Sequence, residues 1–178
     1  MKTYKYILPF FVLLLMSCMQ NSELTSLKGD SDINYKESFA KWNELKKTNG
    51  NSYTYQATFS SWTGFGSITE FRIENGKVVS RTYQEFSIND TTGQKEIRDI
   101  YTETVDDLNS HERGVTPLTI DELYDSCAKD YLIADTDENT LYFNTELNGT
   151  MNLCGYVPNN CADDCYHGIR INSFQWID

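Results

Sequence analysis

The sequence has few of the residues from which catalytic sites are built. It contains two histidines, His111 and His167, both in polar stretches, and it has no Gly-x-Ser-x-Gly motif. Nucleophilic catalysis needs a histidine, an activated serine or cysteine and an orienting acid close together. Because no such set is recognisable, the sequence favours a non-catalytic protein over an enzyme.

Positive charge is also scarce. The chain has 15 Lys and Arg residues against 26 Asp and Glu residues, which gives a formal net charge of −11. Nucleic acids bind clusters of basic residues, and anionic lipid surfaces bind polybasic segments. Because the chain is strongly acidic, neither is an expected partner of its folded domain. The acidity is typical of a soluble domain, and a cationic partner is the weaker alternative.

A hydrophobic run long enough to cross a membrane is absent. The one strongly apolar run, residues 7–16, would reach only ~15 Å as a helix, and a bilayer core is roughly 30 Å thick. Lys2 and Lys5 precede this run, which matches the layout of a signal peptide. An ordinary secretory signal would need a small residue where Leu15 stands.

The end of the apolar run resembles a bacterial lipobox, Leu15-Met16-Ser17-Cys18. We therefore predict a lipoprotein signal peptide over 1–17 and a lipid anchor on Cys18. Two acyl chains on one cysteine give stable membrane attachment. Met19 follows instead of the Asp that retains some lipoproteins at the inner membrane, which favours the outer membrane, on its periplasmic or surface face.

Four of the five cysteines remain once Cys18 is assigned to the lipid. An even number in an exported protein predicts two disulfides among Cys127, Cys154, Cys161 and Cys165. We expect the pairs Cys154–Cys165 and Cys127–Cys161, with Cys127–Cys165 and Cys154–Cys161 nearly as plausible. The spacing of Cys161 and Cys165 also suits zinc, but the oxidising compartment favours disulfides, and no metal or cofactor is predicted.

The N-terminal half of the mature chain predicts a tether, a helix and a meander of strands. Residues 18–33 are rich in small polar residues and predict a flexible tether. Asn34 is a helix cap, and the apolar spacing after it predicts a helix over 35–48. Alternating patterns and turn residues, including the hairpin signal Asn75-Gly76, then predict strands over 53–59, 65–74, 77–88 and 94–104.

The C-terminal half predicts a helix and two strands around a cysteine-bearing loop. Thr119 and Glu122 form a capping box for a helix over 120–132. Strands are expected around 141–143 and over 168–176, joined by a loop over 145–166. A hairpin at Asn148-Gly149 leading into a strand over 150–156 is the less favoured alternative. Residues 34–178 are thus expected to form one α+β domain, with about four meander strands and two further C-terminal strands.

Several spaced segments resemble an uncharacterised family of bacterial exported proteins and lipoproteins. They are Trp42, Tyr53-Thr54-Tyr55, Asn75-Gly76-Lys77-Val78-Val79, Thr119-Ile120-Asp121-Glu122-Leu123-Tyr124 and Tyr142-Phe143 before the cysteine-bearing loop. The resemblance covers about 40–176. It implies an α+β fold and no activity that can be transferred to this chain.

The strongest candidate for a binding surface is the aromatic tip of the first hairpin, with Trp62 and Phe65, because exposed aromatic patches mark binding surfaces. The acidic cluster 135–139 lacks the glycine of an EF-hand, since Thr140 stands at the sixth position, and is interpreted as a solvated turn. We therefore expect a lipid-anchored, monomeric, extracytoplasmic binding module of unknown ligand.

Two alternatives to a binding module stay open. The late cysteines, with His167, suit a redox or metal-binding protein. A structural envelope lipoprotein, by contrast, predicts a molecule without a concave pocket.

Overall fold

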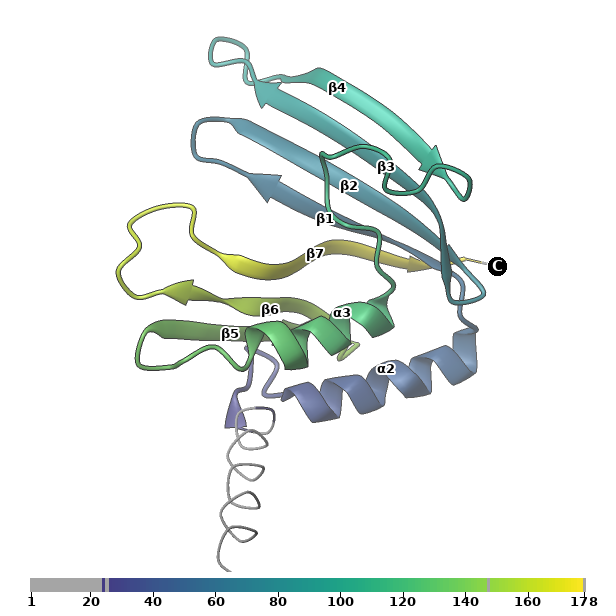
Figure 1. The fold of residues 1–178 in the computed structure, drawn as a ribbon, viewed down its shortest axis with the longest axis vertical. Coiled ribbons are helices and arrows are strands. Elements are labelled where there is room, and N and C mark those ends of the chain that lie inside the picture. The colour runs from purple at the N-terminus through teal and green to yellow at the C-terminus, as the bar shows by residue number, and fades with distance from the viewer. Residues whose placement is uncertain (1–23, 25, 147, 178) are drawn as a thin grey trace, which may run out of the picture.

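The computed structural model describes residues 24, 26–146 and 148–177 (Figure 1). The predicted signal peptide and the predicted lipidation site Cys18 lie outside these residues. The elements are α2 (Tyr35–Asn49), β1 (Tyr53–Ser60), β2 (Phe65–Glu74), β3 (Lys77–Ile88), β4 (Lys95–Thr104), α3 (Ile120–Ser126), a π-helical turn (Cys127–Tyr131), β5 (Asn139–Thr145), β6 (Met151–Pro158) and β7 (His167–Trp176). No helix among the described residues is long and apolar enough to cross a membrane.

The strands form one antiparallel sheet of seven strands in the order β4-β3-β2-β1-β7-β6-β5. The prediction of about four meander strands and two further C-terminal strands was therefore wrong, because three C-terminal strands are present and they complete one sheet with the meander, although both helices were expected and α+β still describes the fold roughly. The last strand, β7, pairs with the first, β1, from Tyr53↔Trp176 onward, and this pairing joins the two groups into one sheet. Both helices lie on the same face of this sheet (Figure 1).

β6 occupies part of the segment that was predicted as a loop over 145–166. Asn148-Gly149 makes the turn into it, with Gly149 at a φ of 84°, as the less favoured alternative supposed. Met151, Cys154 and Gly155 are its buried residues, so burial does not alternate along the strand. The period-2 signal that identifies a strand is therefore missing from this sequence.

The core lies between the helices and the sheet and is mostly aromatic. Trp42 of α2 is fully buried and stacks on Trp176 of β7, with 5.3 Å between ring centroids and 10° between ring planes. Tyr53 packs edge-on against the same indole, and its hydroxyl accepts the backbone N–H of Ile120 at 2.9 Å. This contact anchors the start of α3, which the Thr119–Glu122 capping box completes.

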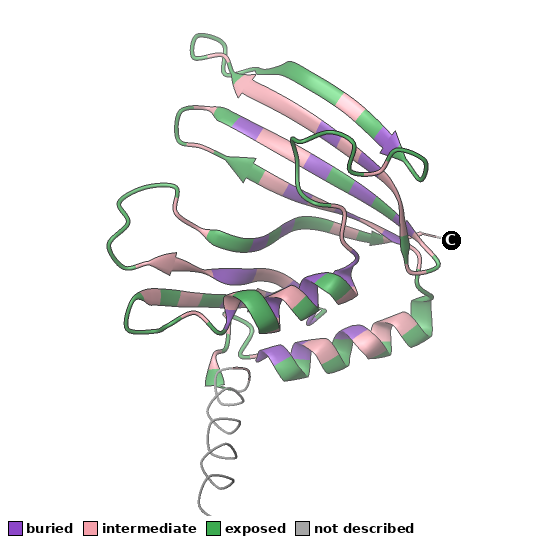
Figure 2. Cartoon of the chain, viewed as in Figure 1, coloured by how far each residue is buried: buried purple, intermediate pink, exposed green. Residues whose placement is uncertain are grey.

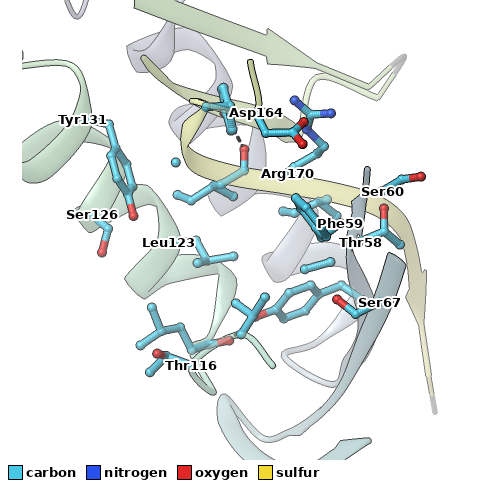
Figure 3. A pocket seen from close by; sticks show the side chains of 18 residues that line it. Thr58, Phe59, Ser60, Ser67, Thr116, Leu123, Ser126, Tyr131, Asp164 and Arg170 are labelled. Atoms are coloured by element: carbon cyan, nitrogen blue, oxygen red, sulfur yellow. Dashed lines mark hydrogen bonds between the residues drawn. The ribbon is translucent and has the colours of Figure 1, made fainter. Parts of the chain in front are cut away.

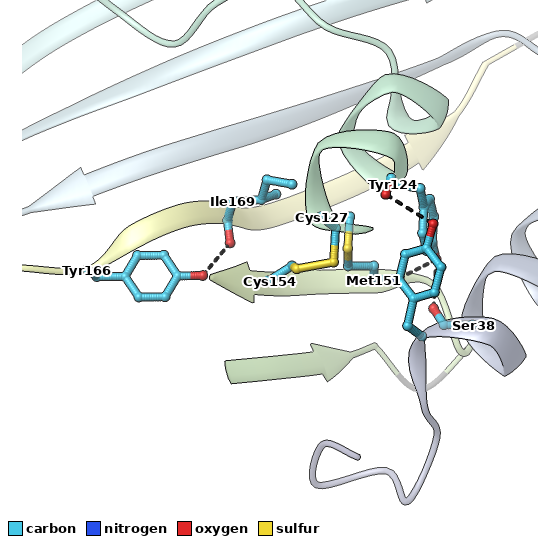
Figure 4. Close-up of a disulfide and its surroundings, with 8 residues drawn as sticks. Ser38, Tyr124, Cys127, Met151, Cys154, Tyr166 and Ile169 are labelled. Carbon is cyan, nitrogen blue, oxygen red and sulfur yellow. Dashed lines mark hydrogen bonds between the residues drawn. A yellow bond between two sulfur atoms is a disulfide. The ribbon is translucent and has the colours of Figure 1, made fainter. Parts of the chain in front are cut away.

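The two disulfides are Cys127–Cys154 and Cys161–Cys165, so both predicted pairs were wrong. Cys127 begins the π-helical turn, and its Cα lies 5.7 Å from that of Cys154 on β6 (Figure 4). The prediction failed because β6 was taken as loop, which left no strand beneath the helix. The remaining two cysteines lie in the exposed turn between β6 and β7 and pair with each other.

A buried tyrosine also joins the elements around the first disulfide. The Tyr124 hydroxyl lies 2.7 Å from Ser38 Oγ of α2 and accepts the backbone N–H of Met151 at 2.8 Å (Figure 4). Burial raises the pKa of Tyr124 to about 12, so the hydroxyl keeps its proton at neutral pH. Helix α2, helix α3 and strand β6 are thus held together at one point.

The described part of the predicted tether is not free. The backbone N–H of Asp30 donates to Asn144 Oδ1 at 3.1 Å, and Ser31 Oγ lies 2.6 Å from Thr145 Oγ1. Leu27 packs against the core. The segment just before α2 is therefore docked against β5, and flexibility stays a prediction for residues 18–23.

Candidate functional site

The sheet is divided at one end by a notch between β1 and β7. The two strands pair only as far as Ala57↔Ile171, whereas β1 continues to Ser60 and β7 begins at His167. Beyond that last pair each strand has a strand partner on one side only among the described residues: β2 for β1, and β6 for β7. Figure 1 shows the two strands diverging toward the ends that carry Ser60 and His167. A β-bulge at Gln56/Ala57 marks the point where the strands part.

A cavity of about 360 Å³ fills this notch. Ala57 and Ile171, which face the helices, line it together with Thr58 and Arg170, which are their neighbours in sequence. Successive side chains of a strand point to opposite faces of a sheet. Val115, Thr116 and Leu118 before α3, Leu123 of α3 and Tyr131 of the π-helical turn line it as well, so the cavity lies between the helix layer and the sheet and reaches the gap between the two strand edges.

Part of the cavity lining is apolar. Phe59, Leu118, Leu123 and Ile169 line it, and the Phe59 side chain is 48% exposed although it belongs to the helix-facing row. The Tyr55 hydroxyl donates to the Leu118 carbonyl at 2.5 Å, which fixes the segment before α3. A half-exposed phenylalanine inside a concave site is available to a ligand.

The cavity also has polar lining residues, which come from the helix layer as well as from the strands. Figure 3 shows Tyr131 and Ser126 across the cavity from Phe59 and Ser60. Asp164, in the turn closed by the second disulfide, accepts a hydrogen bond from Ser61 Oγ at 3.3 Å. The site therefore combines an apolar interior with a polar rim.

Aromatic contacts hold the rim residues at the start of β7. The Arg170 guanidinium lies over the Tyr166 ring, 4.8 Å from its centroid. The Tyr166 hydroxyl donates to the Ile169 carbonyl at 2.8 Å, and burial raises the pKa of Tyr166 well above its ordinary value (Figure 4). The tyrosine therefore stays a hydrogen-bond donor and supports the end of β7 that borders the notch.

One wall of the notch comes from the segment 105–117, which we call the strap. It crosses the helix-facing side of β3 and β4 and supplies Val115 and Thr116 to the cavity (Figure 1). The Val115 N–H donates to Thr69 Oγ1 at 3.2 Å, and its carbonyl accepts from Arg81 Nη1 at 3.2 Å. The wall is therefore held by side chains of β2 and β3.

A buried ion pair fixes the strap. Arg81 of β3 and Glu103 of β4 are 1% and 0% exposed and form two hydrogen bonds, of 2.7 and 2.6 Å. Glu103 also accepts the backbone N–H groups of Asn109 and His111 at 2.7 and 2.8 Å. Glu103 is the single buried residue of β4, and the rest of the strand is almost entirely exposed, as Figure 2 shows.

The carboxyl of Glu103 is ionised despite its burial. Burial alone would raise the pKa of Glu103, but the hydrogen bonds from Arg81 and from the strap N–H groups outweigh it and bring the pKa well below its ordinary value of 4.5. Bidentate arginine–carboxylate pairs are strong and geometrically specific. The strap is thus anchored to a permanent negative charge inside the protein.

The structure gives each histidine a structural contact. His111 stacks on Tyr101 with 4.0 Å between centroids, and its Nδ1 lies 3.0 Å from Glu103 and 3.2 Å from Ser110 Oγ. A catalytic relay needs the serine and the acid on different ring nitrogens, and here both meet the same one. His167 stacks on Tyr156, and the neighbouring cysteines are bridged.

The residues predicted as a binding surface, Trp62 and Phe65, are exposed, but neither is among the residues that line the cavity. Trp62 is 79% exposed and Phe65 is 39% exposed, and Ser61 beside them bonds to Asp164 across the opening. The acidic cluster 135–139 forms a hydrogen-bonded turn into β5, and none of the described residues makes a group that could hold a metal ion.

The sequence did not point to Ala57, Leu118 and Ile169 as cavity residues, because the point where β1 and β7 separate depends on the pairing of distant strands. The glycine at position 168, which has a φ of 150°, is the local feature that could have marked this point. A Cβ there would collide with the Cys154 carbonyl, so this glycine allows β7 to approach β6 as it leaves β1.

Comparisons with known proteins found no family model, no curated protein and no solved structure that matches this chain.

Proposed function

We propose that the protein is a lipid-anchored extracytoplasmic binding module that holds its ligand in the notch between β1 and β7. The two disulfides indicate an oxidising, extracytoplasmic environment. The lipid on Cys18 and a place at the outer membrane are further parts of the proposal, and they rest on the lipobox-like sequence.

The observation that carries the proposal is a cavity bordered by the separated ends of β1 and β7. Its volume of about 360 Å³ falls within the usual range of small-ligand sites, and its apolar interior with a polar rim is their usual composition. A purely structural lipoprotein would have no need of such a pocket. A redox function of the late cysteines has less support, because within the described part of the chain neither sulfur contacts a histidine or carboxylate side chain, and His167 stacks on Tyr156.

Phe59→Ser should weaken ligand binding at least about tenfold, because a phenylalanine ring that a ligand covers contributes on the order of 1.5–3 kcal/mol. The probe is N-phenyl-1-naphthylamine, an uncharged naphthalene, with the site mapped by methyl chemical shifts of Ala57, Leu118 and Ile169. Ile100→Ser is the matched control, since Ile100 is 58% exposed on the edge strand and lies outside the cavity lining. Equal weakening by both variants, or shifts centred on Ile100, would contradict the proposal.

Cys18→Ala should abolish acylation and move the protein from the detergent phase to the aqueous phase on detergent partitioning. Intact mass measures the loss of the acyl groups directly. The double variant Cys161→Ala/Cys165→Ala leaves the lipobox intact and should stay acylated. An unchanged lipid mass in Cys18→Ala would refute the anchor.

A further inference from the structure

The strand edges that border the notch have no main-chain partner on one side. Thr58 to Ser60 of β1 pair with β2 alone, and His167 to Arg170 of β7 pair with β6 alone. Within the described chain, no strand pairing joins these two edges to each other. Free N–H and C=O groups on a strand edge are a template for another strand. A ligand that only filled the apolar space would leave them unmatched.

We infer that the occupant of the notch is an extended, positively charged peptide that adds to the free edge of β1 or β7 as a strand. This inference rests on the proposed function. Alternate side chains of such a peptide point to opposite faces of the sheet. Those directed toward the helices meet Phe59, Leu118 and Leu123, and those directed away meet Thr58 and Arg170. The notch is lined to match this alternation on both faces.

The length of the free edges limits the segment that is recognised. Three residues of β1 and four of β7 remain unpaired toward the notch. At about 3.3 Å per residue, such an edge holds three or four residues of an added strand. One apolar side chain therefore enters the interior, and its neighbours lie on the opposite face or at the rim.

Charge complementarity favours a cationic segment. Asp163 and Asp164 lie in the turn at the rim, and among the described residues neither forms a salt bridge. Arg170 is directed onto the Tyr166 ring rather than onto these carboxylates. The chain as a whole carries a net charge of −11, which attracts a positive partner and repels a negative one.

The test uses the full chain in detergent and an acetylated, amidated heptapeptide in which valine and lysine alternate. We expect saturable binding, with amide chemical-shift changes at Thr58, Ser60 and Arg170. A second version of the peptide carries N-methyl groups on the alternate backbone amides that would face the free edge of β1 or β7. It should bind at least tenfold more weakly, because these amides can no longer donate hydrogen bonds to the strand edge. The version with glutamate in place of lysine should bind more weakly still.

Asp164→Asn supplies the protein-side test, with Asp90→Asn as a matched loss of one exposed carboxylate in the β3–β4 turn. The first should lower affinity for the lysine peptide about threefold to tenfold, and the second should leave it unchanged. Equal binding of the N-methylated peptide overturns strand addition. If the naphthalene probe binds in the notch and no peptide does, the inference fails and the proposed function stands. If neither binds, both fail.

Discussion

Replacing Glu103 with alanine should lower the free energy of unfolding by about 3–5 kcal/mol, which is the usual cost of breaking a buried ion pair. The substitution leaves the Arg81 guanidinium buried without its counter-charge, and it removes the acceptor of the Asn109 and His111 N–H groups. Chemical denaturation followed by tryptophan fluorescence measures the loss.

Glu96→Ala is the matched control, because Glu96 lies on the same strand and forms an exposed pair with Arg98. Exposed pairs contribute at most about 1 kcal/mol, so this variant should unfold almost as the wild type does. A loss of less than 1 kcal/mol in Glu103→Ala would show that the strap does not depend on the pair. Binding in the notch should fall with stability, since Arg81 also holds the Val115 carbonyl.

The same carboxyl predicts a pH signature. Its pKa is lower in the folded protein than its ordinary value of 4.5, so its contribution to stability is fully present above that value and is lost as the pH falls through the folded-state pKa. The wild type should therefore lose stability more steeply than Glu103→Gln below about pH 5. Parallel curves for the two proteins would contradict this assignment.

Removing the Cys127–Cys154 disulfide should cost about 3–4 kcal/mol by the loop-entropy relation, because it closes a loop of 27 positions. Both cysteines are fully buried, so the double substitution to serine adds the cost of unpaired hydroxyls in the core. The thermal midpoint of Cys127→Ser/Cys154→Ser measures the effect against the intact protein.

The second disulfide provides the comparison. Cys161 and Cys165 are four positions apart in an exposed turn, and the same relation predicts a smaller stabilisation, about 2 kcal/mol. Cys161→Ser/Cys165→Ser should therefore remain folded while the first variant is strongly destabilised. Similar losses of thermal stability in the two variants would contradict either the pairing of the four cysteines or the larger contribution of the buried Cys127–Cys154 bond. Because Asp164 lies inside the second loop, that variant should also affect the notch.

Local signals predicted much of the secondary structure. The strands at Phe65–Glu74 and Lys77–Ile88 have the expected bounds, and Asn75-Gly76 turns between them. Helix α2 begins after the Asn34 cap, and α3 begins after the Thr119 capping box. Each of these signals acts over a few residues, so the sequence displays it directly.

The remainder depends on contacts between distant residues. β6 lacks a regular alternation of buried residues, and the β1–β7 pairing joins strands from opposite ends of the chain. Because the sequence did not predict β6, it also gave no indication that Cys154 lies opposite Cys127. The candidate site was likewise predictable only in part. The exposure of Trp62 and Phe65 was expected from their place at a hairpin tip, whereas the notch depends on where two distant strands stop pairing.

The central position of β1 has a consequence for the order in which the domain forms. Strands β1 to β4 are consecutive hairpins and pair through short turns as soon as they are made. The inner side of β1 must wait for β7, which follows all the other strands in the sequence. Until then the middle of the future sheet is an open edge, and Trp42 lacks the indole of Trp176 that covers it. A nascent chain stalled before His167 would therefore expose the unpaired edge of β1, so the addition of the ten-residue strand β7 is the step that joins β1 to the rest of the sheet.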